Sequence, residues 1–510
     1  MKKIFAILMT ICLLAGALSI TAFAAEPGSD VVIRVRAQKK NGDIVELENG
    51  DFKSFVDGWE AAVDLANDHQ KLDENNYDYV VVDLYADWKA DEEGKFGNDD
   101  DLDGIENYTI YVPEDTRIVI NMNGHTIDRG LGDNNEYDGE VIYVDENARL
   151  IINGGKSGDP VVKAGTHPGD VKMGTITGGN SDNGAGGIHI KDHAFVALTN
   201  VHVDGNTADD DYGAGIALYN GASLVMSGGS ISNNRLVGTW AGEWDRGGAI
   251  YAEKAEVTIS NVEIKNNQAY KDYAEGLAIY IEDSSVYVSD CIIDGNGLKT
   301  NADRSYGGVS VIGTDDAYLK ITRTKFTNNG VYLDDLAKNY SNSRVIDTSS
   351  DSTIIIDECV FEGNNTSILL HSYNDMANTT ISVSDSQLVN NNSSVYSGST
   401  PATFENCSFG GNNSPVGNYA FTTQDEGRLV FRNCIMGDST FKNEKAAIFQ
   451  DANGNFPGSI FGEGSLALIV AFLSLIASGV AIFLVVYYNK KKAVPVAANG
   501  VAEPETDDEE

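Results

Sequence analysis

One tetrapeptide recurs along the middle of the chain: an apolar residue, any residue, Gly or Asn, and then Asn. Each copy ends a short stretch in which apolar and polar residues alternate. The final residues of the copies are Asn206, Asn234, Asn267, Asn296, Asn329, Asn364, Asn391 and Asn412. Their spacing runs from 21 residues (391 to 412) to 35 residues (329 to 364). Repeats of this size are typical of solenoids, in which each repeat packs only on its neighbours.

Every repeat also contains a second apolar run that opens with glycine, such as Gly215-Ile216 and Gly276-Leu277-Ala278-Ile279. The alternation has period two, and Gly, Asn, Asp and Ser at its ends favour turns. No stretch of helical period separates the runs, so crossover helices cannot cover a flat parallel sheet. The pattern predicts an all-β chain that winds on itself as a right-handed parallel β-helix.

The final Asn of each repeat is expected at a corner of the coil. Stacked Asn amides can hydrogen bond to one another along the solenoid axis, and Asn tolerates the left-handed backbone angles that corners often require. We therefore interpret these residues as scaffold and not as ligands.

The glycine-led runs and the Phe-x-x-Asn corners resemble the repeats of chlamydial polymorphic membrane proteins. The segment Asn121 to Arg129, with the sequence NMNGHTIDR, resembles the first coil of β-helix repeat proteins on Gram-positive bacteria. The likeness covers roughly residues 50 to 445 and identifies the chain as similar to the pectin-lyase-like superfamily. It implies the fold, whereas that superfamily includes lyases, hydrolases, adhesins and inert stalks.

Targeting segments are expected at both ends. Lys2 and Lys3 precede an apolar run that ends in Ala22-Phe23-Ala24, which predicts a cleaved secretory signal peptide. Leu466 to Val486 carries no charge and is followed by three lysines, which predicts a single membrane-spanning helix with its C-terminal side in the cytoplasm. The predicted organisation is a signal (1–24), an N-terminal cap (25–115), a β-helix (116–445), a linker (446–464), a transmembrane helix (465–488) and an acidic cytoplasmic tail (489–510).

The extracellular portion is strongly acidic. The net charge of the chain is −40, and removing the two signal lysines and the net −3 of residues 465–510 leaves −39 for residues 25–464. This charge argues against nucleic acid as a partner, and it requires a bridging cation for any polyanionic glycan. It is also expected to keep a long rod soluble.

Four cysteines remain after the signal, and each falls two residues before the apolar corner residue or its equivalent. They are Cys291, Cys359, Cys407 and Cys434. At this spacing all four are expected to point inward. Cys291 and Cys359 have a whole coil between them, which is too far for a disulfide, whereas Cys407 and Cys434 lie on neighbouring coils and can either bridge or pack as buried thiols.

Residues 31 to 115 lack the Asn pattern and predict a cap for the open end of the solenoid, with an amphipathic helix from Phe55 to Leu65. Within this segment an acidic loop suggests a calcium site. Its candidate ligands are Asp99, Asp101, Asp103 and Asn107. Alternate carboxylates before a glycine suit a hard cation, although Ile110 stands where an EF-hand carries Glu. The alternative is a solvated acidic hairpin without a metal.

Insertions of five consecutive coils fall at the same place, after the Asn corner, and should emerge on one side of the solenoid. They contain the aromatic residues Trp240, Trp244, Tyr270, Tyr273 and Tyr306. Aromatic rings stack on sugar rings, and carboxylates and arginines bind hydroxyl groups, so the loops suit a polysaccharide or a host or cell-surface ligand. The alternative is that these aromatics pack against the coil wall.

Catalysis would need additional groups. Hydrolysis requires paired carboxylates, for which the clustered candidates are Asp210, Glu243 and Asp245, and lyase chemistry requires a basic proton acceptor, for which they are Arg246, Lys271 and Arg304. Neither set completes a catalytic motif. The sequence thus favours a membrane-anchored extracellular β-helix that binds polysaccharide or acts as an adhesin, with a polysaccharide lyase or glycoside hydrolase as the alternative and an inert stalk as a third.

Overall fold

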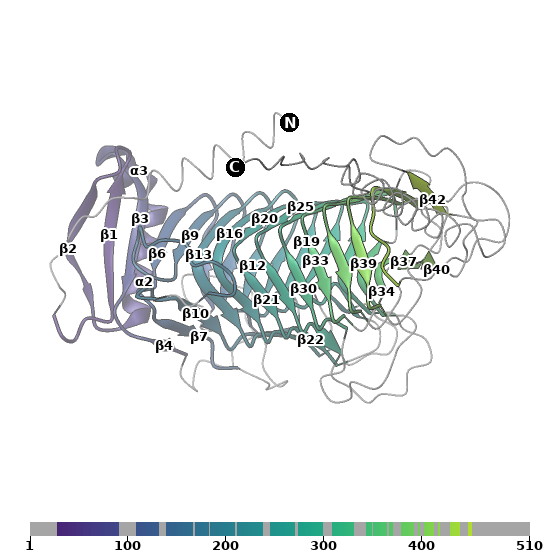
Figure 1. The fold of residues 1–510 in the computed structure, drawn as a ribbon. Helices are drawn as coiled ribbons and strands as arrows, with labels where there is room; N and C mark the ends of the chain where they lie inside the picture. Colours follow the sequence, from purple (N-terminus) through teal and green to yellow (C-terminus); the bar gives the residue numbers. More distant parts are fainter. Residues whose placement is uncertain are drawn as a thin grey trace, which may run out of the picture.

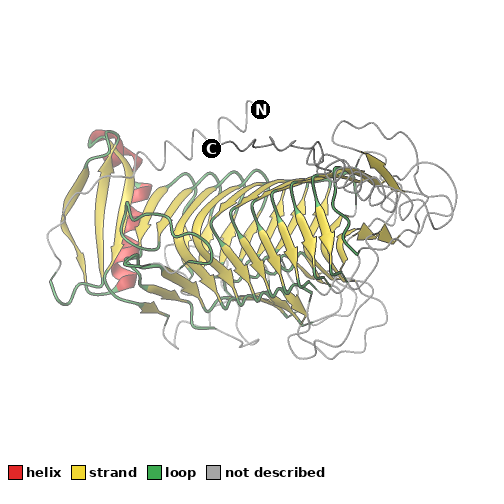
Figure 2. Ribbon diagram, viewed as in Figure 1, coloured by secondary structure: helices red, strands yellow, loops and turns green. Residues whose placement is uncertain are grey.

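The fold is a long parallel β-helix with a small α/β segment at its N-terminal end (Figures 1 and 2). The computed structural model describes residues 28–450 apart from a set of short segments. Those segments are 91–108, 132–138, 167–168, 183, 210–211, 238–244, 271–273, 299–308, 331–342, 349, 365–366, 371–378, 392–395, 398–401, 413–416, 419–428 and 439–446.

The described residues 28–84 of the cap form three strands and two helices. They are β1 (Ile33–Lys39), β2 (Ile44–Phe52), α2 (Phe55–Asn67), α3 (His69–Glu74) and β3 (Tyr77–Leu84). The helix predicted from Phe55 to Leu65 is present and runs two residues further. Antiparallel pairing of β1 with β2 and β3 was not anticipated. Strand β3 then pairs in parallel with the first long solenoid strand, so the cap supplies the partner that the first coil would otherwise lack.

Helix α2 is anchored at its start and on its buried face. The Ser54 side chain accepts a hydrogen bond from the Asp57 amide at 3.4 Å, which caps the helix. Trp59 is fully buried, and its indole Nε1 donates to the Tyr111 carbonyl at 3.3 Å. This side chain therefore connects the cap to the first coil.

Each coil contributes two consecutive strands to the largest sheet, here called sheet A. The upstream strands are β6 (Arg117–Asn121), β9 (Arg149–Asn153), β20 (Glu256–Ser260), β25 (Ser285–Ser289), β29 (Tyr318–Thr322), β32 (Thr353–Asp357), β35 (Thr380–Ser384), β38 (Ala402–Glu405), β41 (Leu429–Arg432) and β42 (Ala447–Gln450). The downstream strands are β4 (Trp88–Lys89), β7 (Thr126–Asp128), β10 (Gly174–Thr177), β21 (Glu263–Lys265), β26 (Ile292–Asp294), β30 (Lys325–Thr327), β33 (Val360–Glu362), β36 (Gln387–Val389) and β39 (Ser408–Gly410). In two coils one long strand spans both positions, namely β13 (Phe195–Asp204) and β16 (Ser223–Ser232).

Two further parallel sheets complete the coils. Sheet B contains β5 (Ile110–Val112), β8 (Ile142–Val144), β12 (Ile188–Ile190), β15 (Ile216–Leu218), β18 (Asp245–Arg246), β19 (Ile250–Glu253), β23 (Ala274–Glu275), β24 (Ile279–Glu282), β28 (Val309–Asp315), β31 (Ser343–Thr348), β34 (Ser367–Leu370), β37 (Tyr396–Ser397) and β40 (Gly417–Asn418). Sheet C contains β11 (Asn180–Ser181), β14 (Thr207–Ala208), β17 (Arg235–Leu236), β22 (Gln268–Ala269) and β27 (Gly297–Leu298). Successive strands pair in register, so equivalent residues of neighbouring coils form straight rows along the axis.

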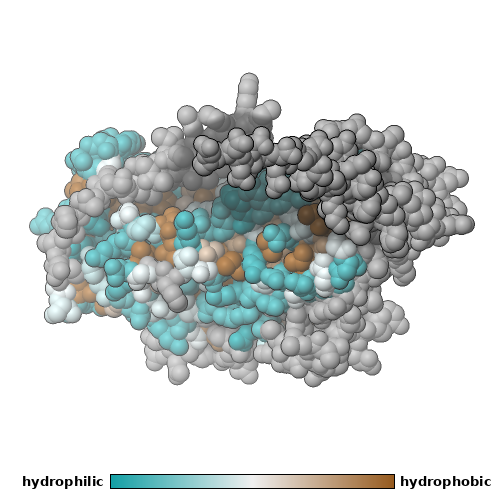
Figure 3. Space-filling model, in the orientation of Figure 1, coloured by the Kyte–Doolittle hydropathy of each residue, from teal (hydrophilic) through white to brown (hydrophobic). Residues whose placement is uncertain are grey.

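The interior is filled by alternate strand residues, which stack on their equivalents in the next coil. Phe326 and Phe361 stack with ring centroids 4.4 Å apart, and both are fully buried. On the face drawn in Figure 3, the described residues are mainly hydrophilic with scattered hydrophobic ones. This division between inside and outside is what the period-two pattern predicted.

The Asn ladder is confirmed as scaffold. In a representative step, the Asn234 amide nitrogens of the backbone and the side chain both donate to Asn267 Oδ1, at 3.1 and 3.0 Å. The same pair of hydrogen bonds joins each successive pair of ladder residues from Asn206 to Asn412. The expectation for the backbone angles needs a correction, because the left-handed residue is the one before the final Asn. Asn266 (φ 55°) and Gly295 (φ 66°) are examples, which explains why the third position is Gly or Asn.

The predicted signal peptide and the predicted span at residues 465–488 lie outside the described residues. Within the described part of the chain, no helix is both long enough and apolar enough to cross a membrane.

Candidate functional site

The outer face of sheet B carries a straight row of ring-bearing side chains. Each strand contributes a triplet such as Ile279-Tyr280-Ile281, in which the two outer residues point into the core and the middle one points out. In register order, the middle residues are Tyr111, Tyr143, His189, Ala217, Tyr251, Tyr280, Gly313 and Asp347. We call this set the tyrosine row.

The rings of the tyrosine row pack on one another along the axis. Tyr251 and Tyr280 stack with centroids 5.9 Å apart and planes inclined by 5°, and Tyr212 from the preceding loop stacks on Tyr251 at 4.7 Å. Tyr251 is 3% exposed and Tyr280 is 1% exposed. Their ring faces are thus occupied by protein, so a sugar ring cannot stack on these two tyrosines without displacing neighbours.

Arg246 lies over the end of this row and is held by two carboxylates. Its guanidinium carbon is 4.5 Å from the centre of the Tyr280 ring. The guanidinium approaches Glu282 at 3.1 Å and Glu275 at 3.5 Å. Glu282 also accepts a hydrogen bond from the Tyr251 hydroxyl at 3.3 Å. The hydroxyl, the carboxylates and the cation therefore form one connected polar group.

A second arginine and acid follow along the axis. Arg344 donates to Asp347 at 2.6 Å, and the side chains are 12% and 17% exposed respectively. Burial raises the pKa of Asp347 to about 7, because the loss of hydration outweighs the attraction of Arg344. Burial also raises the pKa of Glu275, although Arg246 opposes the shift. Two carboxyl groups here thus favour the protonated form more than ordinary acids do.

Gly313 makes room for this arrangement. It stands in the tyrosine row between Tyr280 and Asp347, and a Cβ atom at this position would lie 2.7 Å from the Tyr280 ring. A larger residue would clash with that ring. We call the side chains of Arg246, Glu275, Glu282, Arg344 and Asp347 the arginine–carboxylate cluster.

Only part of the predicted site falls within the described residues. The predicted residues that lie outside them are Asp210, Trp240, Glu243, Trp244, Lys271, Tyr273, Arg304 and Tyr306. Of the rest, Arg246 belongs to the arginine–carboxylate cluster. Its neighbour Asp245 is buried on the opposite side of the strand, because adjacent residues of a strand face opposite ways. Tyr270 follows strand β22 of sheet C and is half-buried.

The sequence reasoning did not single out Tyr251, Tyr280, Glu282 or Asp347. The candidate residues were taken from the insertions, whereas these side chains come from the strands that follow the insertions. A detectable signal exists, because the segments Ile250-Tyr251-Ala252-Glu253 and Ile279-Tyr280-Ile281-Glu282 are near copies. Aligning the repeats on these triplets would have shown Tyr and Glu at matching outward positions.

The predicted calcium loop, with Asp99, Asp101, Asp103 and Asn107, also lies outside the described residues. Within the described ranges, no group of three or more His, Cys, Asp or Glu side chains is arranged to hold a metal ion.

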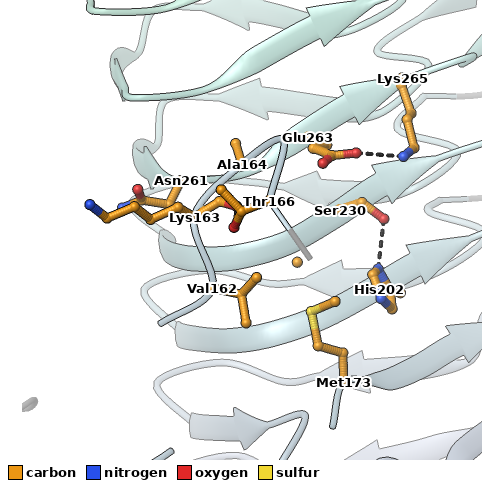
Figure 4. A pocket seen from close by; sticks show the side chains of 11 residues that line it. Val162, Lys163, Ala164, Thr166, Met173, His202, Ser230, Asn261, Glu263 and Lys265 are labelled. Carbon is orange, nitrogen blue, oxygen red and sulfur yellow. Dashed lines mark hydrogen bonds and ion pairs between the residues drawn. The ribbon is translucent and has the colours of Figure 1, made fainter. Parts of the chain in front are cut away.

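A separate small cavity lies where the segment 162–173 crosses the outer face of sheet A (Figure 4). Its volume is about 170 Å³, and it is lined by Val162, Lys163, Ala164, Thr166, Met173, His202, Gly229, Ser230, Asn261, Glu263 and Lys265. His202 Nδ1 lies 2.8 Å from the Ser230 hydroxyl, and Glu263 accepts from the Gly165 amide at 2.9 Å. Burial lowers the pKa of His202, which favours the neutral ring. The contact between Gly165 and Glu263 attaches the crossing segment to the solenoid, and the cavity is smaller than the 300–1,000 Å³ of common ligand sites.

Two other histidines of the solenoid, His125 and His189, are placed apart from this cavity. His189 lies on the outer face of sheet B and His202 on that of sheet A, so they do not form a pair. His125 Nδ1 lies 3.2 Å from the Asp87 carboxylate.

Comparison with known proteins supports the fold. Residues 116–329 match the family model described as a right handed beta helix region. Searches of curated proteins and of solved structures gave no match.

Proposed function

We propose that this right-handed β-helix protein of the pectin-lyase-like type binds polysaccharide at the outer face of sheet B. The observation that supports the proposal is the arginine–carboxylate cluster. Two arginines and three carboxylates lie on strands of sheet B, and Arg246 and Glu282 retain 22% and 31% side-chain exposure. Guanidinium and carboxylate groups together recognise the hydroxyl pairs of sugars, because they offer fixed donors and acceptors.

The insertions complete the proposed site. The sequence predicts that the insertions before β18 and β23 supply aromatic rings to this site, and they carry Trp240, Trp244, Tyr270 and Tyr273, of which only Tyr270 is among the described residues. Since the ring faces of Tyr251 and Tyr280 are occupied, stacking on sugar would come from these loop residues. On this proposal, Trp244→Ala costs about 1 to 3 kcal/mol of binding free energy.

The test is binding of the purified protein to an array of neutral and acidic polysaccharides, with affinities then measured by calorimetry. Arg246→Ala should weaken binding at least tenfold. Arg323→Ala is the matched control, because Arg323 also pairs with an acid, Asp290 at 2.7 Å, but on sheet A. Thermal unfolding of both variants checks that the fold persists. Equal losses in the two variants, or no binding to any glycan, would reject this site.

A polysaccharide lyase or glycoside hydrolase is the second candidate, and one observation favours it. Asp347 has a pKa raised to about 7, which suits a proton donor near neutral pH, and Arg344 offers positive charge close by. A lyase would release unsaturated products that absorb in the ultraviolet, and a hydrolase would release new reducing ends. In either case Asp347→Asn should abolish turnover and leave binding largely intact. Absence of both products across the array would remove this candidate.

We also propose that the solenoid is displayed outside a bacterial cell and anchored by residues 465–488. The support is the signal-like segment 1–24 and the uncharged stretch followed by lysines. Protease added to intact cells should digest an epitope in the solenoid and spare one placed in residues 489–510. Protection of both epitopes would contradict this topology.

A further inference from the structure

One column of small side chains runs through the core at the bend between the two strands of sheet A. In order of coils, it consists of Cys291, Thr324, Cys359, Ser386, Cys407 and Cys434. Each follows a residue with a left-handed backbone, such as Asn406 (φ 55°) and Asn433 (φ 50°). The column is bonded between coils, because the Cys359 amide donates to the Ser386 hydroxyl at 3.0 Å.

Cys407 and Cys434 occupy successive places in this column. Their flanking residues are in register, with Glu405 opposite Arg432, and the Ile435 amide donates to the Cys407 carbonyl at 2.9 Å. Neighbouring strands lie about 4.8 Å apart, which is inside the 4.4–6.8 Å range of Cα separations in disulfides. The two thiols also point alike, since each lies 3.3 Å from the carbonyl two residues before it.

The other described cysteines are not placed in this way. Thr324 separates Cys291 from Cys359, and Ser386 separates Cys359 from Cys407. Two strand spacings amount to about 9.6 Å, which is beyond reach of a disulfide. The column therefore contains its own internal controls.

The cysteine pair lies at the end of the Asn ladder. The Asn ladder stops at Asn412, and the next coil carries Asp438 near this corner, whose carboxylate accepts from the Gly411 amide at 2.8 Å. A covalent link between these two coils would replace the missing Asn step. Cys434 is half-buried, whereas the other three described cysteines are buried.

We propose that Cys407 and Cys434 are a modification site, at which an oxidising environment forms a disulfide between the coil of β38 and β39 and the coil of β41. Both thiols lose a proton and one sulfur–sulfur bond forms between them. The two electrons and two protons reduce the disulfide of an oxidoreductase or of oxidised glutathione to two thiols. The bond closes a loop of 27 residues (407 to 434) and restricts the unfolded chain. Hydrogen bonding from Cys407 lowers the pKa of Cys434, which favours its thiolate as the attacking sulfur.

The test uses the purified full-length protein incubated with oxidised glutathione, then denatured, alkylated without reductant, digested and analysed by mass spectrometry. We expect the peptides of Cys407 and Cys434 to be joined to each other, and those of Cys291 and Cys359 to be alkylated. Complete alkylation of Cys407 and Cys434, or a bridge from either to Cys359, would overturn the proposal.

Thermal unfolding gives a second readout. Dithiothreitol should lower the melting temperature of the oxidised wild type and of Cys359→Ser, and should leave that of Cys434→Ser unchanged. If Cys434→Ser fails to fold, the comparison of wild type with Cys359→Ser and the peptide mapping still decide. No response of the wild type to dithiothreitol would count against a bridge that holds these two coils together.

Discussion

Removal of one amide from the middle of the Asn ladder has a cost that follows from its contacts. The Asn267 side chain makes four hydrogen bonds in a fully buried setting. Its oxygen accepts from the backbone and side-chain nitrogens of Asn234, at 3.1 and 3.0 Å. Its nitrogen donates to the Ile231 carbonyl and to Asn296 Oδ1, both at 3.0 Å. Asn267→Ala removes all four.

The groups left behind are affected unequally. The Asn234 side-chain nitrogen keeps the Val203 carbonyl at 3.1 Å, and Asn296 Oδ1 keeps the Asn267 backbone amide at 3.1 Å. The Asn234 backbone amide loses the side-chain acceptor that satisfied it in the core. Stranding one buried donor costs about 1 to 3 kcal/mol, and weakening the others adds about 1 kcal/mol. We therefore expect Asn267→Ala to destabilise the solenoid by about 2 to 4 kcal/mol.

Urea unfolding followed by circular dichroism measures the total, and hydrogen exchange at the Asn234 amide measures the local effect. A loss of about 2 kcal/mol corresponds to roughly thirtyfold faster exchange. Asn266→Gly is the control, because Asn266 is left-handed (φ 55°) and lies next to the ladder without being a step of it. Wild-type exchange at the Asn234 amide in Asn267→Ala, together with an unchanged unfolding midpoint, would show that the ladder does not hold the coils.

Three further outcomes are expected. The pKa of Asp347 is about 7 in the folded protein and about 3.9 in the unfolded chain, so the folded state binds the proton more tightly and the free energy of unfolding should fall as pH rises from 4 to 7. Asp347→Asn should flatten this pH dependence of the urea midpoint. The same pH dependence in the variant would contradict the raised pKa. Trp59→Ala should lower the free energy of unfolding by about 3 to 5 kcal/mol and remove the contact between the cap and Tyr111. Limited proteolysis should then cleave within residues 28–90 earlier than in the wild type, and an unchanged cleavage rate would contradict this. Calcium should bind the acidic loop weakly and release heat that is absent in Asp101→Ala, whereas matching calorimetric traces would remove the site.

Much of the fold could be predicted because the repeat carries it in local chemistry. The period-two alternation specified which side chains of a strand such as β25 are inside, and the recurring Asn specified one corner of each coil from Asn206 to Asn412. The inward direction of Cys291, Cys359 and Cys407 followed from their fixed offset to the corner residue, and the structure confirms that all three are buried. A stretch of helical period likewise located α2.

The pairing of the cap could not be predicted in the same way. Strand β2 pairs antiparallel with β1 in a segment that contains no repeat, and β3 pairs in parallel with the solenoid strand β6. No local pattern distinguishes a strand that pairs antiparallel within the cap from one that starts the parallel stack. The left-handed residue was predicted at the final Asn of each repeat, but it is the residue before it. Both Gly and Asn tolerate such backbone angles, so only the geometry of the coil selects between the two adjacent positions.

The sequence by itself therefore determined the solenoid, its corner amides and the stacking of equivalent residues, because each depends on spacing that repeats from coil to coil. The tertiary structure decided which side chains meet across the coils. Arg246 of β18 meets Tyr280 and Glu282 of β24 through the stacking of the coils, and Asp347 joins Arg344 in a buried place that changes its protonation. Burial and through-space charge depend on neighbours from other repeats, so the arginine–carboxylate cluster became visible only when the coils were stacked.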